Sequence, residues 1–360
     1  MRRSSERRSL LRSAGRAGSL LGMRRLFLNL LSAVAAAVLI AGLTALAASS
    51  VSGQAASSVE AVAEPARPPG VRSFGVYVDP WHLDDWTRRV GAAPQLVAKF
   101  EAFSLRRTID AFLTEAHRRG IRRVMVSWEP WQPVPTSEGA VAQLRPQRGY
   151  TNADIAAGVQ DAYIKRFAAG LARFPGQVEL RWAHEMNGQW YPWSWGAADY
   201  RRAWRRIVRL FDEAGADNVS FVWSVNPNLY QSPDAWRRLT RRYWPGSRYV
   251  DAVGMTMIDF GGIKDYRVAR FAPRLADLRR TYRKPILLTE VNTDYRGRVR
   301  WLRDLRRLLR RTPGISAVCW SQLPSRGTAH LKGAGWLDWD VQRDPRAAAV
   351  LRGIVRDGRK

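Results

Sequence analysis

Short apolar runs rich in β-branched and aromatic residues alternate along this chain with longer segments of helical period. Eight such runs predict β-strands, at 73–78, 95–100, 121–128, 178–182, 219–225, 250–257, 284–290 and 315–321. Between them, apolar residues recur at helical spacing over 105–119, 155–173, 198–214 and 299–311. Strands interleaved with helices predict parallel βαβ units and an α/β fold, a closed (β/α)8 TIM barrel. A doubly wound open sheet is the alternative, but no Gly-x-Gly-x-x-Gly follows the first strand.

The N-terminal region differs from the rest of the chain in its pattern. Residues 1–25 contain eight arginines and one glutamate, and an apolar stretch from Leu26 to Ala48 follows. This pattern predicts a signal peptide or a signal anchor over 1–48, and the sequence leaves both open. Residues 49–71, rich in Ala, Ser, Val and Pro, predict a disordered linker. We therefore expect one barrel domain over 72–357, secreted or anchored to the outer face of the cytoplasmic membrane.

One aromatic-rich stretch stands out as candidate chemistry. Directly after the strand 178–182, the chain reads His184-Glu-Met-Asn-Gly-Gln-Trp-Tyr-Pro-Trp-Ser-Trp195. Flat aromatic faces beside a few polar groups suit the C–H faces and hydroxyls of sugar rings. The candidate sugar contacts here are His184, Asn187, Trp190 and Trp193. The alternative is that these aromatic side chains only pack under their own loop.

Two motifs of this sequence, one after the fourth predicted strand and one in the seventh, resemble those of glycoside hydrolase family 26. This is a family of (β/α)8-barrel enzymes that includes β-mannanases. His184-Glu-Met-Asn-Gly188 resembles its acid/base motif at the end of the fourth strand, and Lys284-Pro-Ile-Leu-Leu-Thr-Glu290 its seventh strand. The resemblance covers about residues 72 to 355. It implies a retaining glycosidase acting by double displacement, with Glu185 as general acid/base and Glu290 as nucleophile. No cofactor is implied.

Side chains at the ends of other predicted strands complete the expected site. Barrel enzymes hold their sites at the carboxyl ends of the strands. Further candidate sugar contacts are therefore Trp128, Glu129, Asn226, Tyr230 and Trp320. For Trp320, as for Trp223, a plain core position is the alternative.

The sequence departs from the family at two positions. Ile258 stands about where the family usually has a tyrosine that holds the nucleophile. Glu290 is then differently tuned, or another group such as Tyr230 serves instead. Glu129 falls where mannan-cleaving members tend to carry a histidine. A carboxyl group there changes the polarity of the site, so cleavage of mannan rather than of another β-glycan does not follow from the resemblance.

Other chemistry finds little support in the sequence. His184-Glu185 lacks the second histidine of His-Glu-x-x-His, because Gly188 occupies that position, and only four histidines are present. We therefore expect no metal site. The single cysteine, Cys319, allows no disulfide within one chain and lies in an apolar run, so we expect it in the core. Serine-hydrolase chemistry lacks its Gly-x-Ser-x-Gly motif.

The charge of the chain is strongly positive, at +28, with 59 Lys and Arg against 31 Asp and Glu. The arginines fall in helix-like segments, which indicates solvated outer faces, with attraction to an anionic cell-surface polymer or a membrane surface as the alternative. No zinc-finger or RNA-binding signature accompanies the charge, so we expect no nucleic acid partner. The oligomeric state stays open.

Three functions therefore compete. The first is a retaining hydrolase of an extracellular β-linked polysaccharide, mannan-like or related. The second is a catalytically weak carbohydrate-binding barrel at the cell surface. The third is a basic protein bound to an anionic cell-surface polymer for structural purposes.

Overall fold

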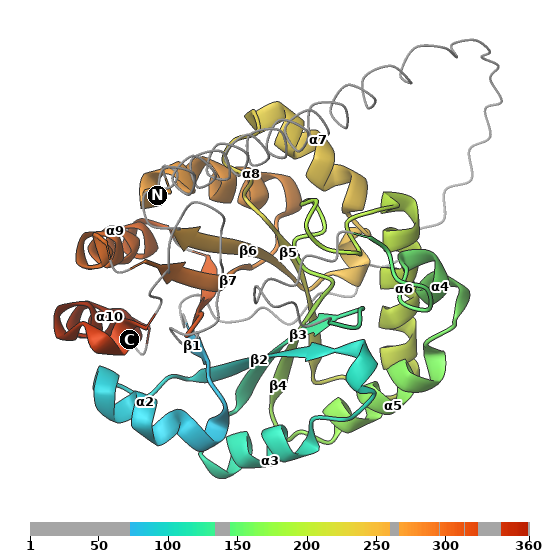
Figure 1. Ribbon diagram of the computed structural model, residues 1–360, viewed down its shortest axis with the longest axis horizontal. Coiled ribbons are helices and arrows are strands. Elements are labelled where there is room, and N and C mark those ends of the chain that lie inside the picture. Colours follow the sequence, from blue (N-terminus) through green and yellow to red (C-terminus); the bar gives the residue numbers. More distant parts are fainter. Residues whose placement is uncertain are drawn as a thin grey trace, which may run out of the picture. The chain divides into compact units, whose positions relative to one another are not determined.

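A computed structural model describes residues 73–133, 145–259, 266–294, 296–312, 314–322 and 340–358. Its eight strands pair in parallel and in chain order, and the last pairs with the first, so the sheet is a closed barrel. Figure 1 shows the helices outside this ring of strands. The strands are β1 (Ser73–Tyr77), β2 (Leu96–Ala102), β3 (Arg123–Glu129), β4 (Gln177–Trp182), β5 (Val219–Val225), β6 (Ala252–Asp259), β7 (Ile286–Thr293) and β8 (Ile315–Trp320). The predicted TIM barrel is confirmed.

The α-helices follow the strands as a (β/α)8 barrel requires. They are α2 (Leu83–Val90), α3 (Asp110–Arg118), α4 (Asn152–Ala157), α5 (Asp161–Ala172), α6 (Ala197–Glu213), α7 (Pro233–Tyr243), α8 (Ala272–Tyr282), α9 (Arg298–Arg311) and α10 (Pro345–Asp357). Short 3-10 helices cover Pro80–His82, Phe103–Leu105, Ser247–Tyr249, Val268–Arg270 and Val341–Arg343.

Most predicted boundaries lie within two residues of those in the structure, and three elements differ by more. The helix expected over 155–173 is divided, because Gly158 has a φ of 96° that caps α4 before α5 begins. The helix expected from 105 begins at Asp110, since a 3-10 turn occupies Phe103–Leu105. Strand β7 continues three residues past Glu290, to Thr293. Glu290 therefore projects from within a paired strand rather than from a loop.

The barrel interior is packed below the site. Tyr77, Leu96, Ala98, Met125 and Cys319 form one buried cluster, and Val222, Ala252, Leu287 and Ala317 form another. The buried position expected for Cys319 is confirmed. A larger cluster contains buried side chains from the strands and from the surrounding helices. Such a filled interior leaves the carboxyl-end rim as the place for chemistry.

The predicted signal or anchor (1–48) and linker (49–71) lie outside the described residues, and the boundaries of 72–357 stay predictions. All of the described residues belong to one compact unit, Ala66–Lys360. Within the described part of the chain, we find no helix whose length and apolar character would let it cross a bilayer.

Candidate active site

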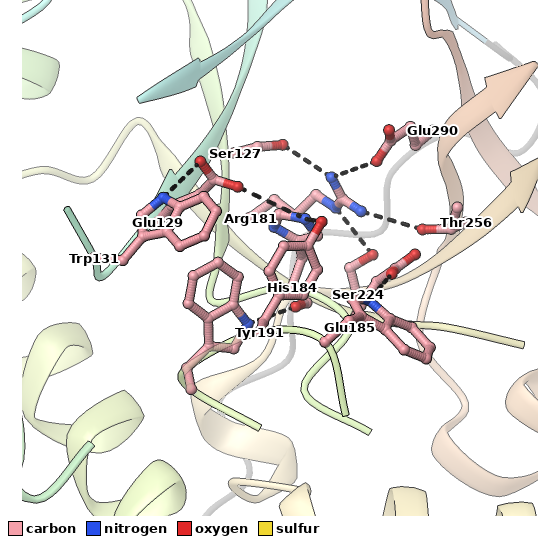
Figure 2. Close-up of polar contacts among 12 residues, drawn as sticks. Ser127, Glu129, Trp131, Arg181, His184, Glu185, Tyr191, Ser224, Thr256 and Glu290 are labelled. Atoms are coloured by element: carbon pink, nitrogen blue, oxygen red, sulfur yellow. Dashed lines mark hydrogen bonds and ion pairs between the residues drawn. The ribbon is translucent and has the colours of Figure 1, made fainter. Parts of the chain in front are cut away.

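A buried arginine lies at the centre of the site. Arg181, on β4, is fully buried, and Figure 2 shows its guanidinium bonding to side chains from β3, β5, β6 and β7. Nη1 donates to Glu290 Oε2 at 3.2 Å and to Ser127 Oγ at 3.0 Å. Nε donates to Ser224 Oγ at 3.1 Å, and Nη2 to Thr256 Oγ1 at 3.2 Å. A buried cation requires such partners, and these fix its position.

Glu290 projects from β7 toward this guanidinium. Burial raises the pKa of its carboxyl group, the charge and hydrogen bond of Arg181 oppose that rise, and the charge of Glu185 adds to it. The two carboxyl groups therefore lie within electrostatic range of each other. Arg181 is the cation that favours the ionised form of Glu290, which a nucleophile needs.

Glu185 lies in the turn that follows β4, in a strained backbone conformation. Its φ is 53°, and that of Ala183 is 43°, in the left-handed region that residues with a side chain seldom adopt. The Glu185 amide donates to the Ser224 carbonyl at 2.8 Å, and the Glu185 carbonyl accepts from the Gly188 amide at 2.8 Å. Its Oε2 accepts from Trp190 Nε1 at 2.9 Å. Strain held in this way is typical of functional sites.

The aromatic side chains of His184, Tyr191 and Trp193 pack against one another beside the turn that carries Glu185. His184 is fully buried, and burial together with the nearby Arg181 charge lowers its pKa well below the ordinary value, so its ring is neutral. Its Nε2 lies 3.2 Å from Tyr191 Oη, and its carbonyl accepts from Trp193 Nε1 at 2.7 Å. Tyr191 and Trp193 stack with ring centroids 4.4 Å apart. These residues orient the turn that carries Glu185.

Glu129, at the end of β3, brings a third carboxyl group to the site. Its Oε2 accepts from Trp131 Nε1 at 3.1 Å, and its Oε1 lies 4.0 Å from His184 Nε2 (Figure 2). Burial raises its pKa to about 8, with Trp131 and Arg181 opposing the rise and Glu290 adding to it. Near neutral pH Glu129 is therefore mainly a neutral acid that can donate a hydrogen bond.

Two asparagines join the loops after β4 and β5. Asn187 Nδ2 donates to the Asn226 carbonyl, and the Asn226 amide donates to Asn187 Oδ1, both at 2.8 Å. The Asn187 side chain thus bonds to the Asn226 backbone and positions the two loops, while Asn226 Oδ1 accepts from the Asn228 amide at 2.8 Å. Trp190 and Tyr230, by contrast, are 38% and 54% exposed, as residues that contact a large ligand must be. The ring of Tyr230 contacts that of Tyr266.

Two predicted sugar contacts, Trp128 and Trp320, do not reach the site. Side chains alternate between the two faces of a strand, so Trp128 faces away from the interior that Ser127 faces. It stacks on Phe167, with ring centroids 4.4 Å apart, and is fully buried. Trp320 is also fully buried and packs in the large core cluster. It therefore occupies the plain core position that the sequence offered as the alternative to a sugar contact. Trp193 supports His184 and is 1% exposed, which leaves it no accessible face.

The sequence reasoning missed Arg181, Thr256, Trp131 and Tyr191 as parts of the site. One signal for Arg181 was available, because a charged residue inside the apolar strand 178–182 must find buried partners. Its partners Ser127, Ser224 and Thr256 come from three other strands, and no local pattern brings them together. Ile258 lies on β6 beside Asn292, whereas Thr256 is the residue that pairs with Glu290.

The described residues contain no cluster of three His, Cys, Asp or Glu side chains that could hold a metal ion. The carboxyl groups of the site can act as acid, base or nucleophile, and Arg181 supplies a fixed positive charge beside them.

Comparison with known families and proteins agrees with the resemblance seen in the motifs. Residues 157–269 match the model of glycosyl hydrolase family 26. This segment includes the Glu185 motif and strands β4 to β6. The predicted family resemblance is thereby confirmed.

Similar proteins act on more than one polysaccharide, to judge by their names. Endoglucanase H of Acetivibrio thermocellus is 26% identical over 254 residues, which cover 65% of this chain and 24% of that protein. A mannan endo-1,4-beta-mannosidase of Bacillus subtilis is 32% identical over 108 residues, covering 26% of this chain and 28% of that one. The chain thus spans about a quarter of the length of these relatives.

A solved family 26 β-mannanase from Bacteroides ovatus has the same fold, with a TM-score of 0.56 and 18% identity, over 80% of this chain and 89% of that one.

Proposed function

We propose that this chain, with its family 26 segment at 157–269, is a retaining glycoside hydrolase that cleaves β-linked polysaccharide by double displacement. The observation that carries the proposal is that Glu185, in the turn after β4, and Glu290, on β7, join one bonded network although 105 residues separate them. Glu290 accepts from Arg181, Arg181 donates to the Ser224 hydroxyl, and the Ser224 carbonyl accepts from the Glu185 amide. Paired carboxyl groups at such a rim are what glycosidic bond cleavage requires.

Each carboxyl group has a separate task in this mechanism. Glu290 attacks the anomeric carbon and forms a covalent glycosyl-enzyme, while Glu185 donates a proton to the departing oxygen. Glu185 then removes a proton from the water that hydrolyses the intermediate. Arg181 holds Glu290 Oε2 at 3.2 Å and favours its ionised state. Trp190 holds Glu185 Oε2 at 2.9 Å.

The substrate class we propose is an extracellular β-glycan, mannan-like or related. The names of the relatives, endoglucanase and mannan endo-1,4-beta-mannosidase, support a β-linked polymer cut internally. Exposed Trp190 offers a flat face for a pyranose ring, and neutral Glu129 adds a carboxyl group that can donate a hydrogen bond. The N-terminal sequence pattern supports secretion or anchoring at the outer face of the cytoplasmic membrane.

A catalytically weak carbohydrate-binding barrel is the second candidate. The raised pKa of Glu290, together with Ile258 in place of the family's usual tyrosine, favours it, because a protonated Glu290 cannot attack. The close contact of Arg181 with Glu290 favours the enzyme instead.

Sugar release from a panel of soluble polymers decides between the two. The panel contains β-mannan, glucomannan, mixed-linked β-glucan and xylan, and the wild type is assayed beside Glu290→Ala. We expect reducing ends from at least one polymer with the wild type and none with the variant. Binding of a polymer without any cleavage by the wild type would instead establish the binding barrel.

A further inference from the structure

Positive charge is concentrated on one arc of the outer helices. Helices α6 to α10 contain 22 arginines, of which only Arg274 and Arg298 are buried, against seven Asp and Glu residues. Helices α2 to α5 contain five Lys and Arg against six Asp and Glu. Figure 1 shows α6 to α10 as consecutive members of the outer ring. We call the outward faces of α6 to α10 the basic arc.

Ion pairing differs between the two halves of the ring. On α2 and α3, Arg88 and Arg89 pair with Asp85, and Arg118 pairs with Glu115. On α6 and α9, Arg202 pairs with Asp199 and Arg307 with Asp304, but α6 to α10 have too few acidic residues to pair with all of their arginines. Six exposed arginines of the basic arc have no carboxylate partner among the residues that the structure describes: Arg238, Arg241, Arg242, Arg300, Arg303 and Arg311. Uncompensated like charges repel one another, so the fold gains no stability from this excess.

The shape and chemistry of the basic arc indicate what it binds. The arc follows the curved outside of a barrel over five successive helices, which a flexible linear polyanion can follow and a flat bilayer cannot. Among the described residues, the exposed large apolar side chains are Trp81, Leu105, Val159, Trp190, Trp195 and Tyr230. All six lie outside α6 to α10. The basic arc therefore offers neither apolar side chains for insertion into lipid nor aromatic platforms for stacking bases.

We propose that the basic arc binds a flexible anionic polysaccharide through its carboxylate or phosphodiester groups. Guanidinium groups pair with both kinds of anion. The arc lies on the outer helical face, and Glu185 and Glu290 lie at the carboxyl-end rim, so a polymer can occupy the arc while the site stays open. This binding is independent of the proposed hydrolytic activity. It retains the protein at an anionic polymer matrix.

The test measures binding of fluorescent alginate, a linear polyuronate, to the full-length protein at low and moderate salt, with uncharged dextran as the reference polymer. The first variant is R300Q/R303Q/R311Q on α9, and the second is R238Q/R241Q/R242Q on α7. The matched control, R88Q/R89Q/R118Q, removes three arginines that already have carboxylate partners. All proteins keep the same N-terminal region, so its arginines contribute equally.

We expect each arc variant to bind alginate about tenfold or more weakly at low salt, with a shallower salt dependence, because fewer counterions are released. The control should stay within about twofold of wild type, and all four proteins should melt at similar temperatures. Failure of the wild type to bind alginate, or an equal loss in the control, would overturn the proposal. The proposal would also be overturned if the arc variants no longer bound duplex DNA or phosphatidylglycerol vesicles but still bound alginate as the wild type does. Sugar release by the arc variants measures the proposed hydrolytic activity independently of alginate binding, so failure of one proposal can be told from failure of the other.

Discussion

Replacement of Arg181 by glutamine removes the only positive charge bonded to Glu290 within the described residues. Arg181 is fully buried, its Nη1 lies 3.2 Å from Glu290 Oε2, and Glu290 is 13% exposed, so solvent screens the pair little. Loss of the cation disfavours the ionised carboxylate. Because the proposed nucleophile must be ionised, the variant should lose activity at the acidic end of its pH range.

The size of the effect follows from the distance. Two unit charges 3.2 Å apart attract by about 5 kcal/mol at an effective dielectric constant of about 20. The delocalised guanidinium charge lies farther away than its nearest nitrogen, and water entering the space will recover part of the loss. If about a third of the attraction is lost, the acid limb of kcat/KM moves to higher pH by about one pH unit, since one unit corresponds to about 1.4 kcal/mol.

The assay is the pH dependence of kcat/KM, which reports groups of the free enzyme. Arg181→Lys is the matched variant, because it keeps the charge but cannot reproduce the bonds to Ser127, Ser224 and Thr256. It should lower kcat with a smaller movement of the acid limb. Loss of one partner of a buried pair costs about 3 to 5 kcal/mol of stability, so near-ultraviolet circular dichroism must first show that each variant is folded. A folded Arg181→Gln enzyme whose acid limb coincides with that of the wild type would refute this reasoning.

Three further predictions concern the other groups of the site. Burial raises the pKa of Glu129 to about 8, so the folded state holds its proton more tightly than the unfolded state, and stability from this group is lost as pH rises from about 4.5 to about 8. Urea unfolding at several pH values should show Glu129→Gln gaining on the wild type across that window, and a constant difference would contradict the assignment. Trp190→Phe keeps an aromatic face but loses the 2.9 Å bond to Glu185, so kcat should fall about tenfold with little change in KM. A rise in KM as large as the fall in kcat would instead indicate that Trp190 stacks on the substrate. Glu185→Ala should lower cleavage of polysaccharide by about 100-fold or more, yet leave kcat/KM, which reports formation of the glycosyl-enzyme, little changed for a dinitrophenyl glycoside whose leaving group needs no proton, whereas Glu290→Ala should fail on both.

The barrel was predictable because its signal is repeated. Each of the eight apolar runs matched a strand, and the run 219–225 matched β5 residue for residue. Helix boundaries were harder, because the positive φ at Gly158 depends on a local backbone conformation that helical periodicity does not encode. Apolar residues recur at helical spacing on both sides of Gly158, so the sequence pattern did not indicate the break between α4 and α5.

The site was predictable only where one short segment carried the information. The motif around Glu185 and the end of the Glu290 run located both carboxyl groups. Arg181 makes its side-chain contacts with residues on five other strands, and this arrangement exists only once the barrel closes. Trp128 was wrongly predicted for a different reason. A residue near the end of a predicted strand can lie on either face of that strand, and Trp128 lies on the face turned away from the barrel interior.

The central claim is that Glu290 attacks the anomeric carbon. The most direct measurement is mass spectrometry of the protein after incubation with a dinitrophenyl 2-deoxy-2-fluoro-β-glycoside of the sugar that it releases, because the fluorine slows breakdown of a glycosyl-enzyme. The account predicts time-dependent inactivation and one added sugar on the peptide that contains Glu290, absent from Glu290→Ala. A sugar attached to another residue, or an active enzyme that releases the α-anomer first, would contradict it.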